Sequence, residues 1–176
     1  MTNYFRRQLA LYVEYHRDPW NCAAHVLGII TLFLGAILPL TLWPITRFGD
    51  HVTVATVMVL PVLAYWLVLD PAVGLAILGA AVLLLSTAVV MVAHMSAPAV
   101  WVTSAVLLVF GAGAQIVGHQ LFEHRQPSMA DHPTHFLLGP PFVMAKLFVV
   151  LGFRRDLAAV IGPVAEPARA NNPGNC

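Results

Sequence analysis

The stretch AVGLAILGAAVLLLSTAVVMVA, residues 72–93, decides the fold class because it contains no Asp, Glu, Lys or Arg. A helix needs about 20 consecutive apolar residues to cross the hydrocarbon core of a membrane. Three further runs lack the same charged side chains, and they cover residues 24–45, 52–69 and 99–118. Together the four runs predict an all-α polytopic membrane bundle with four spanning helices.

The composition of the whole chain agrees with this prediction. Of its 176 residues, 59% are hydrophobic and only 10% are charged, whereas about a quarter of a soluble domain is charged. The net charge of +1 gives no indication of a nucleic-acid partner. Cys22 and Cys176 form neither a disulfide framework nor a metal-binding pair, and residues 1–17 do not resemble a cleavable signal peptide. We expect one membrane-embedded helical domain over residues 1–163 and a disordered polar tail over residues 164–176.

Two shorter segments flank the predicted spans. Residues 3–16 have the spacing of an amphipathic interfacial helix, whose apolar face carries Phe5, Leu9, Tyr12, Val13 and His16. Asp18-Pro19 should end this helix, and Asn21 is then placed to cap the first span. The last apolar segment, residues 136–153, contains Gly139-Pro140-Pro141 and Lys146, which favours a re-entrant or surface-lying helix over a fifth span.

The distribution of arginines predicts the orientation. With a cytoplasmic N-terminus and four spans, Arg47 alone lies outside, and the cytoplasmic side carries Arg6, Arg7, Arg17, Arg125, Arg154, Arg155 and Arg169. This asymmetry follows the positive-inside rule. We therefore expect an integral multi-pass protein, in the plasma or inner membrane of a bacterium or the endoplasmic reticulum of a eukaryote.

An even number of spans brings two polar stretches to the same cytoplasmic face. One carries His16 and His25, and the other is QIVGHQLFEHRQP, residues 115–127. His119 and Glu123 are four residues apart and share a helix face, as a metal-binding pair requires. His16 and His25 lie on opposite faces of a continuous helix, so they converge only if the chain breaks at Pro19.

Imidazole together with carboxylate suits iron, zinc, copper or nickel, so the two stretches predict a metal site. His124, His132 and His135 follow on the same side as weaker candidate ligands, whereas His51 and His94 fall on the opposite face as ordinary loop residues. The alternative for any single histidine is a hydrogen-bonding role at the membrane interface.

Four segments resemble a membrane family long catalogued as a domain of unknown function. They are YVEYHRDPWNCAAHVLGI (12–29), LDPAVGLAILGAAVLLL (69–85), QIVGHQLFEHRQPSMAD (115–131) and LLGPPFVMAKLF (137–148). The characterised fungal members of this family are Fe(II)-dependent 2-hydroxy fatty acid dioxygenases of fatty-acid alpha-oxidation. Ile30 and Lys146 are departures, since they stand near where many members have proline and glutamate.

The resemblance implies the same chemistry for this chain, with Fe(II), a 2-hydroxy fatty acid, dioxygen and the lipid bilayer as cofactor and partners. It implies that His16, His25 and His119 bind the iron, with Glu123 as a ligand or as a group that orients one. Tyr15, Asn21, Gln115 and Glu123 match catalytic positions. The product would be a fatty acid one carbon shorter.

Three other classes of protein are alternatives to this interpretation. A membrane di-iron hydroxylase needs several histidine-rich boxes, and this chain has only HPTH at residues 132–135. A metal or proton transporter places ionisable groups at mid-membrane, whereas the span centres here are apolar. A non-catalytic protein that binds metal and lipid remains an alternative, and the oligomeric state is left open.

Overall fold

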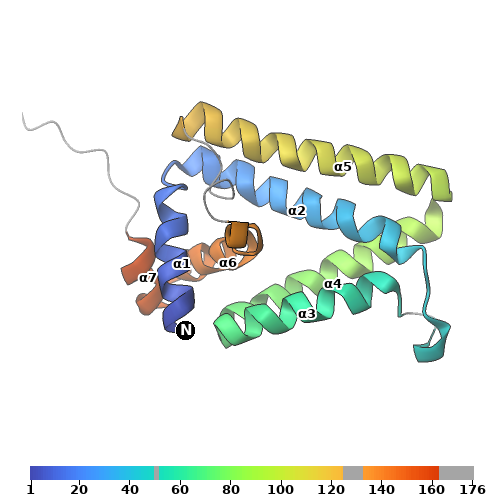
Figure 1. The fold of residues 1–176 in the computed structure, drawn as a ribbon, viewed down its shortest axis with the longest axis horizontal. Coiled ribbons are helices and arrows are strands. Elements are labelled where there is room, and N and C mark those ends of the chain that lie inside the picture. The colour runs from blue at the N-terminus through green and yellow to red at the C-terminus, as the bar shows by residue number, and fades with distance from the viewer. Residues whose placement is uncertain (50–51, 125–132, 163–176) are drawn as a thin grey trace, which may run out of the picture.

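Helices form every named element of the computed structural model, which describes residues 1–49, 52–124 and 133–162. Four of them build an elongated bundle (Figure 1), and these are α2 (Pro19–Thr41), α3 (Val54–Leu69), α4 (Pro71–His94) and α5 (Ala97–Gly118). Three shorter helices gather where α2 begins, namely α1 (Asn3–Glu14), α6 (Gly139–Val150) and α7 (Arg155–Ile161). The predicted all-α class is confirmed. The expected tail at residues 164–176 lies outside the described residues.

Three helices are long and apolar enough to cross a membrane: Pro19–Thr41, Pro71–His94 and Ala97–Glu123. The predicted span at residues 52–69 forms α3, but this helix has only 16 residues. At 1.5 Å per residue it is about 24 Å long, which is less than the hydrocarbon core of about 30 Å. The 12 residues of α6 reach about 18 Å. Four crossings therefore remain a prediction.

The start of α2 differs from the predicted one. The helix begins at Pro19, and the Asp18 carboxylate accepts hydrogen bonds from the backbone N–H groups of Trp20 (2.7 Å) and Asn21 (3.2 Å). The prediction that Asn21 is the N-cap is wrong, because proline is preorganised for the first helical position and Asp18 already caps the free N–H groups. Asn21 is instead buried in the first turn.

The apolar face predicted for residues 3–16 is the face that α1 buries. Phe5, Leu9 and Tyr12 are buried, and they belong to a core cluster with residues of α3, α6 and α7. Thr2 caps the helix by accepting a hydrogen bond from the Phe5 N–H at 3.2 Å. This face contacts the protein itself, so the interfacial position of the helix in a membrane remains a prediction.

Glycines allow α2 and α5 to pack closely side by side (Figure 1). A Cβ atom added to Gly28 would lie 2.9 Å from the Gly111 carbonyl oxygen, and one added to Gly111 would lie 2.8 Å from the Gly28 oxygen. Small residues at such crossings let helix backbones approach in membrane bundles. The close approach brings the start of α2 beside the end of α5.

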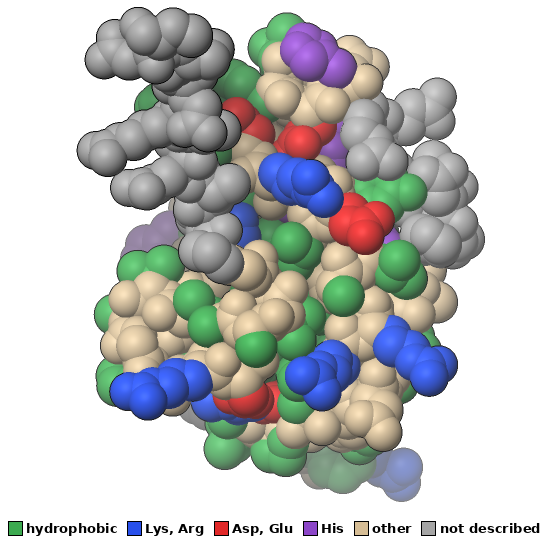
Figure 2. Space-filling view, turned by 90° about the vertical axis from the view of Figure 1, so that its left-hand side faces the viewer, with side chains coloured by type: hydrophobic (Ala, Val, Ile, Leu, Met, Phe, Trp, Pro, Cys, Tyr) green, Lys and Arg blue, Asp and Glu red, His purple; other side chains and the backbone are tan. Residues whose placement is uncertain are grey.

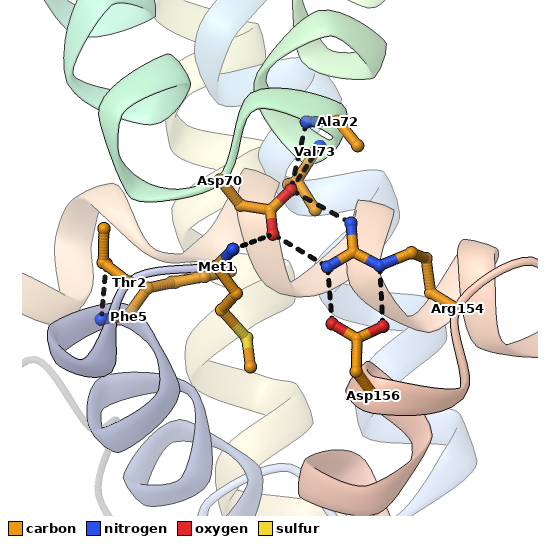
Figure 3. Close-up of polar contacts among 8 residues, drawn as sticks. All are labelled: Met1, Thr2, Phe5, Asp70, Ala72, Val73, Arg154 and Asp156. Carbon is orange, nitrogen blue, oxygen red and sulfur yellow. Dashed lines mark hydrogen bonds and ion pairs between the residues drawn. The ribbon is translucent and has the colours of Figure 1, made fainter.

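Asp70 joins the turn between α3 and α4 to the C-terminal part of the chain (Figure 3). Its carboxylate accepts hydrogen bonds from the Ala72 and Val73 N–H groups, both at 3.0 Å, and from the Arg154 guanidinium at 3.1 and 2.9 Å. The Met1 ammonium lies 3.3 Å away. Burial opposes ionisation of Asp70, but these hydrogen bonds outweigh it and lower its pKa to about 2.

The same end of the molecule carries much of the polar surface. Figure 2 looks onto it and shows basic, acidic and histidine side chains among hydrophobic ones. By contrast, α4 exposes large apolar side chains along its length, including Leu75, Leu83 and Val90. This contrast suits a bundle whose sides face lipid and whose end faces water.

Candidate metal centre

Three buried histidines converge where α2 begins and α5 ends. His16, His25 and His119 are 1%, 2% and 1% exposed, and each offers a ring nitrogen within 4.8 Å of those of the other two. Their ring centroids are 4.4 to 4.8 Å apart, with the rings edge to face. Three imidazoles in such a cluster are a candidate ligand set for a transition metal.

The break between α1 and α2 makes this convergence possible. The first helix ends at Glu14 and the second begins at Pro19, so His16 lies in the connection and turns back toward His25. The expectation that these two histidines meet only if the chain breaks at Pro19 is confirmed. His119 comes from the π-helical segment η2 (His119–Glu123), which extends α5. Single-turn π segments occur frequently at functional sites.

Backbone carbonyls fix the tautomers of two of the rings. His16 Nδ1 donates to the Tyr12 carbonyl at 2.8 Å, and His25 Nδ1 donates to the Asn21 carbonyl at 3.1 Å. Since a carbonyl only accepts, the Nε2 atoms are left with their lone pairs. This N–H to carbonyl arrangement is the one that usually orients a metal-binding histidine.

Within the three-histidine cluster, two buried ring nitrogens make no hydrogen bond to the residues that the structure describes, and these are His16 Nε2 and His119 Nδ1. Buried polar atoms in proteins are nearly always satisfied. A metal ion bound by the three histidines would satisfy both atoms, so the residues fit a metal by their chemistry as well as by their convergence.

The surroundings of His16 keep it neutral. Burial, followed by the neighbouring His25, lowers the pKa of His16 to about 2. The Tyr12 ring stacks on the His16 ring, with centroids 4.1 Å apart and an angle of 5° between the planes. Burial also raises the pKa of Tyr12 above its usual value, so the phenol beside the histidines stays protonated. Neutral imidazole is the form that binds metals.

Glu123 lies beside the histidine cluster and contacts the start of α2. One of its carboxylate oxygens, Oε1, accepts hydrogen bonds from the Asp18 N–H at 2.8 Å and from Asn21 Nδ2 at 3.2 Å. The group of possible ligands within the described residues contains the three histidines and not Glu123. The carboxylate therefore ties the end of α5 to the break before α2.

The other predicted site residues lie around this centre. Tyr15 accepts a hydrogen bond at its carbonyl from Asn21 Nδ2, at 3.4 Å. His135 is buried, and its Nε2 lies 3.2 Å from Gln8 Oε1. His124 is exposed and ends η2 with a φ of 50°. His132 falls outside the described residues.

A cavity of about 400 Å³ adjoins the histidines, a volume typical of small-molecule sites. Polar side chains line one part of its wall, namely Tyr12, His25, Gln115, His119 and His135. The rest of the wall is apolar and includes Leu32, Leu108 and Ala112. The cavity thus combines a polar region at the candidate ligands with an apolar region between the helices.

Sequence reasoning missed Gln8 and Trp66. Gln8 was identifiable, because it lies four residues before Tyr12 and hence on the face that α1 buries. Trp66 donates from Nε1 to the Leu137 carbonyl at 2.7 Å and fixes the segment that precedes α6. Only the three-dimensional structure shows that contact, since the two residues are far apart in the sequence.

The fold and the site define a helical protein of membrane type with a candidate three-histidine metal centre. The chain belongs to the Mpo1-like family of 2-hydroxy-palmitic acid dioxygenases, whose model matches residues 2–151. It is 30% identical over 160 residues to the 2-hydroxy-palmitic acid dioxygenase MPO1 of Saccharomyces cerevisiae, covering 89% of this chain and 86% of the relative. No solved structure matches it. The family predicted from the sequence motifs is thereby confirmed.

Proposed function

We propose that this protein is an Fe(II)-dependent dioxygenase that cleaves the C1–C2 bond of 2-hydroxy long-chain fatty acids. The observation that carries the proposal is the position of three buried histidines in and beside the wall of a mostly apolar cavity. A histidine cluster suits the metal, and the apolar region suits an acyl chain. Family membership and the relative's printed activity support the same assignment.

The reaction balances without an external reductant. A 2-hydroxy acid and dioxygen give the acid one carbon shorter, carbon dioxide and water. C2 is oxidised from alcohol to carboxyl and C1 from carboxyl to carbon dioxide, which supplies the four electrons that dioxygen accepts. Iron, when bound by His16, His25 and His119, supplies the redox chemistry through which dioxygen reacts with the organic substrate.

The remaining residues of the site position the histidines or bind the substrate. The carbonyls of Tyr12 and Asn21 orient His16 and His25, and Glu123 holds the chain break that brings them together. Gln115 and His135 lie in the cavity wall with His25 and His119, where they can hydrogen-bond the hydroxyl and carboxylate of the substrate. Tyr15 supports this arrangement through its hydrogen bond with Asn21.

The proposal is tested by oxygen uptake. The protein is purified anaerobically in detergent, loaded with Fe(II) and supplied with 2-hydroxy-palmitic acid, and the fatty acid product is identified by mass spectrometry. We expect uptake with a product one carbon shorter, and we expect His119→Ala to abolish both uptake and stoichiometric iron binding. His94→Ala is the matched control, because His94 is exposed at the end of α4.

The alternative function is a non-catalytic protein that binds metal and lipid. It predicts stoichiometric metal in the wild type without oxygen uptake for any 2-hydroxy acid. That result would overturn the proposed reaction while leaving the metal centre in place.

A further inference from the structure

A second cavity of about 510 Å³ lies next to the first and has a wall of apolar side chains with Trp66. Its wall comes from α2, α3, α4 and α6, and the α4 contribution includes Ala80, Ala81 and Leu84. The first cavity has wall residues from α5, such as Leu108 and Ala112, and none from α4. Residues of α5 therefore line only the first cavity, and residues of α4 line only the second.

The two cavities share part of their walls. Five residues line both, namely Ile29, Phe33, Ala36, Val62 and Pro140. These five residues form the shared wall, and Phe33 is the largest of them. Its ring packs against Trp66, with centroids 6.0 Å apart and the planes at 58°. Trp66 is itself held by the hydrogen bond to Leu137, so the Phe33 ring rests against a fixed neighbour.

The lengths of the cavities suggest what each would hold. Along α2 the first cavity extends from His25 to Ala36, eleven residues or about 16 Å at the rise of an α-helix. The second cavity runs alongside the first from Val26 and continues past Ala36 to Leu40, about 22 Å from His25. An acyl chain in one membrane leaflet spans half of the hydrocarbon core, about 15 Å. The first cavity thus matches one ordinary long acyl chain, and the end of a longer chain would have to cross the wall shared with the second cavity, to which Phe33 contributes.

We propose that Phe33 is the residue that determines chain-length specificity, separating an acyl cavity at the histidines from a second cavity that admits the end of a very long chain. This inference rests on the proposed function for the nature of the ligand. The Phe33 ring keeps a chain of palmitic length within the first cavity. Removing the ring joins the two cavities into one channel.

Photolabelling tests the position of the chain directly. The probes are 2-hydroxy fatty acids of palmitic and behenic length, each with a diazirine at the end of the chain, and labelled residues are mapped by mass spectrometry. In the wild type we expect the palmitic-length probe to label α5 at Leu108 or Ala112. In Phe33→Ala the behenic-length probe should label α4 at Ala80 or Leu84.

Turnover provides the second measurement. Phe33→Ala should raise the ratio of kcat/KM for the behenic-length over the palmitic-length acid at least about tenfold, the effect of about one methylene accommodated in an apolar pocket. Phe33→Trp should lower that ratio. Leu84→Ala is the matched control, because it enlarges the second cavity and leaves the partition intact. Adding Ala81→Phe to Phe33→Ala should reverse the gain by filling the second cavity.

The outcomes separate this inference from the proposed reaction. Suppose that α5 is labelled in the wild type and α4 in Phe33→Ala, but no oxygen is consumed. This result would overturn the proposed reaction and support the two cavities. Oxygen uptake with labels on the exposed outer side chains Val109 and Val150 would overturn the cavity assignment and leave the reaction standing. An unchanged length ratio in both Phe33→Ala and Phe33→Trp, with normal thermal unfolding, would overturn the role of Phe33.

Discussion

At the scale of single residues, Glu123 is best explained as a positioning group. Glu123→Ala removes the acceptor for Asp18 N–H and Asn21 Nδ2. Hydrogen bonds to charged groups are worth about 1.5–3 kcal/mol each, and loss of a group that orients ligands lowers metal affinity about 10- to 100-fold. We expect a lower unfolding temperature together with weaker iron binding, measured by thermal unfolding and metal titration.

Glu123→Gln is the matched variant because its amide oxygen can still accept both hydrogen bonds. It should recover most of the stability and the affinity. If Glu123→Gln loses iron completely while unfolding at the wild-type temperature, Glu123 is a ligand instead.

The lowered pKa of Asp70 predicts how the stability of the folded protein depends on pH. Its pKa in the folded protein is about 2, below the ordinary value of 3.8, so the folded state favours the charged form. The stabilisation is complete above pH 4 and is lost as the pH falls toward 2. A shift of this size corresponds to about 2 kcal/mol. Unfolding in detergent, followed by circular dichroism across this range, should show a decline that Asp70→Asn reduces. An equal decline in Asp70→Asn would assign it to other carboxylates.

At the scale of elements, the crossing of α2 and α5 links stability to the candidate metal centre. In Gly111→Leu the new Cβ would lie 2.7 Å from Leu32 Cγ and 2.8 Å from the Gly28 carbonyl oxygen. The helices must then separate, and His25 moves away from His119. Overpacking of this kind costs about 1–3 kcal/mol, and we expect a lower unfolding temperature accompanied by reduced iron content.

Gly113→Leu is the control for that experiment, since no atom lies within 4 Å of a Cβ added to Gly113. It makes the same change on the same helix and should keep both stability and iron. Normal iron content in Gly111→Leu would show that the two helices can separate without moving the histidines.

At the scale of the whole molecule, the sequence predicted the helices and their common polar end, because long apolar runs and proline breaks are local signals. It also predicted which histidines converge, since Pro19 lies between His16 and His25. The predicted N-cap of α2 was wrong because Asp18 and Asn21 are both good N-cap residues. Only the start of the helix at Pro19 decides between them. The cavities could not be predicted, because Phe33 and Trp66 meet only through packing.

The number of membrane crossings is the remaining question at this scale, and α3 decides it. If α2, α3, α4 and α5 all cross, Arg47 and Ser96 lie on one side and Arg7 lies on the other. If α3 does not cross, because it is only about 24 Å long, Arg47 and Ser96 lie on opposite sides. Single cysteines at Arg47, Ser96 and Arg7, in a background with Cys22→Ser and Cys176→Ser, distinguish the two by labelling with an impermeant maleimide.

We expect the Arg47→Cys and Ser96→Cys variants to react on the same, non-cytoplasmic side, and Arg7→Cys on the cytoplasmic side. The packing of α3 along α4 favours this result, because it places Asp70, between these helices, at the end where Met1 and Arg154 lie (Figure 3). Three crossings would need the two helices to separate and the Met1–Asp70 ion pair to break, because Met1 and Asp70 would then lie on opposite sides. Labelling of the Arg47→Cys and Ser96→Cys variants from opposite sides would therefore contradict both the predicted number of spans and the packing of α3 in the membrane.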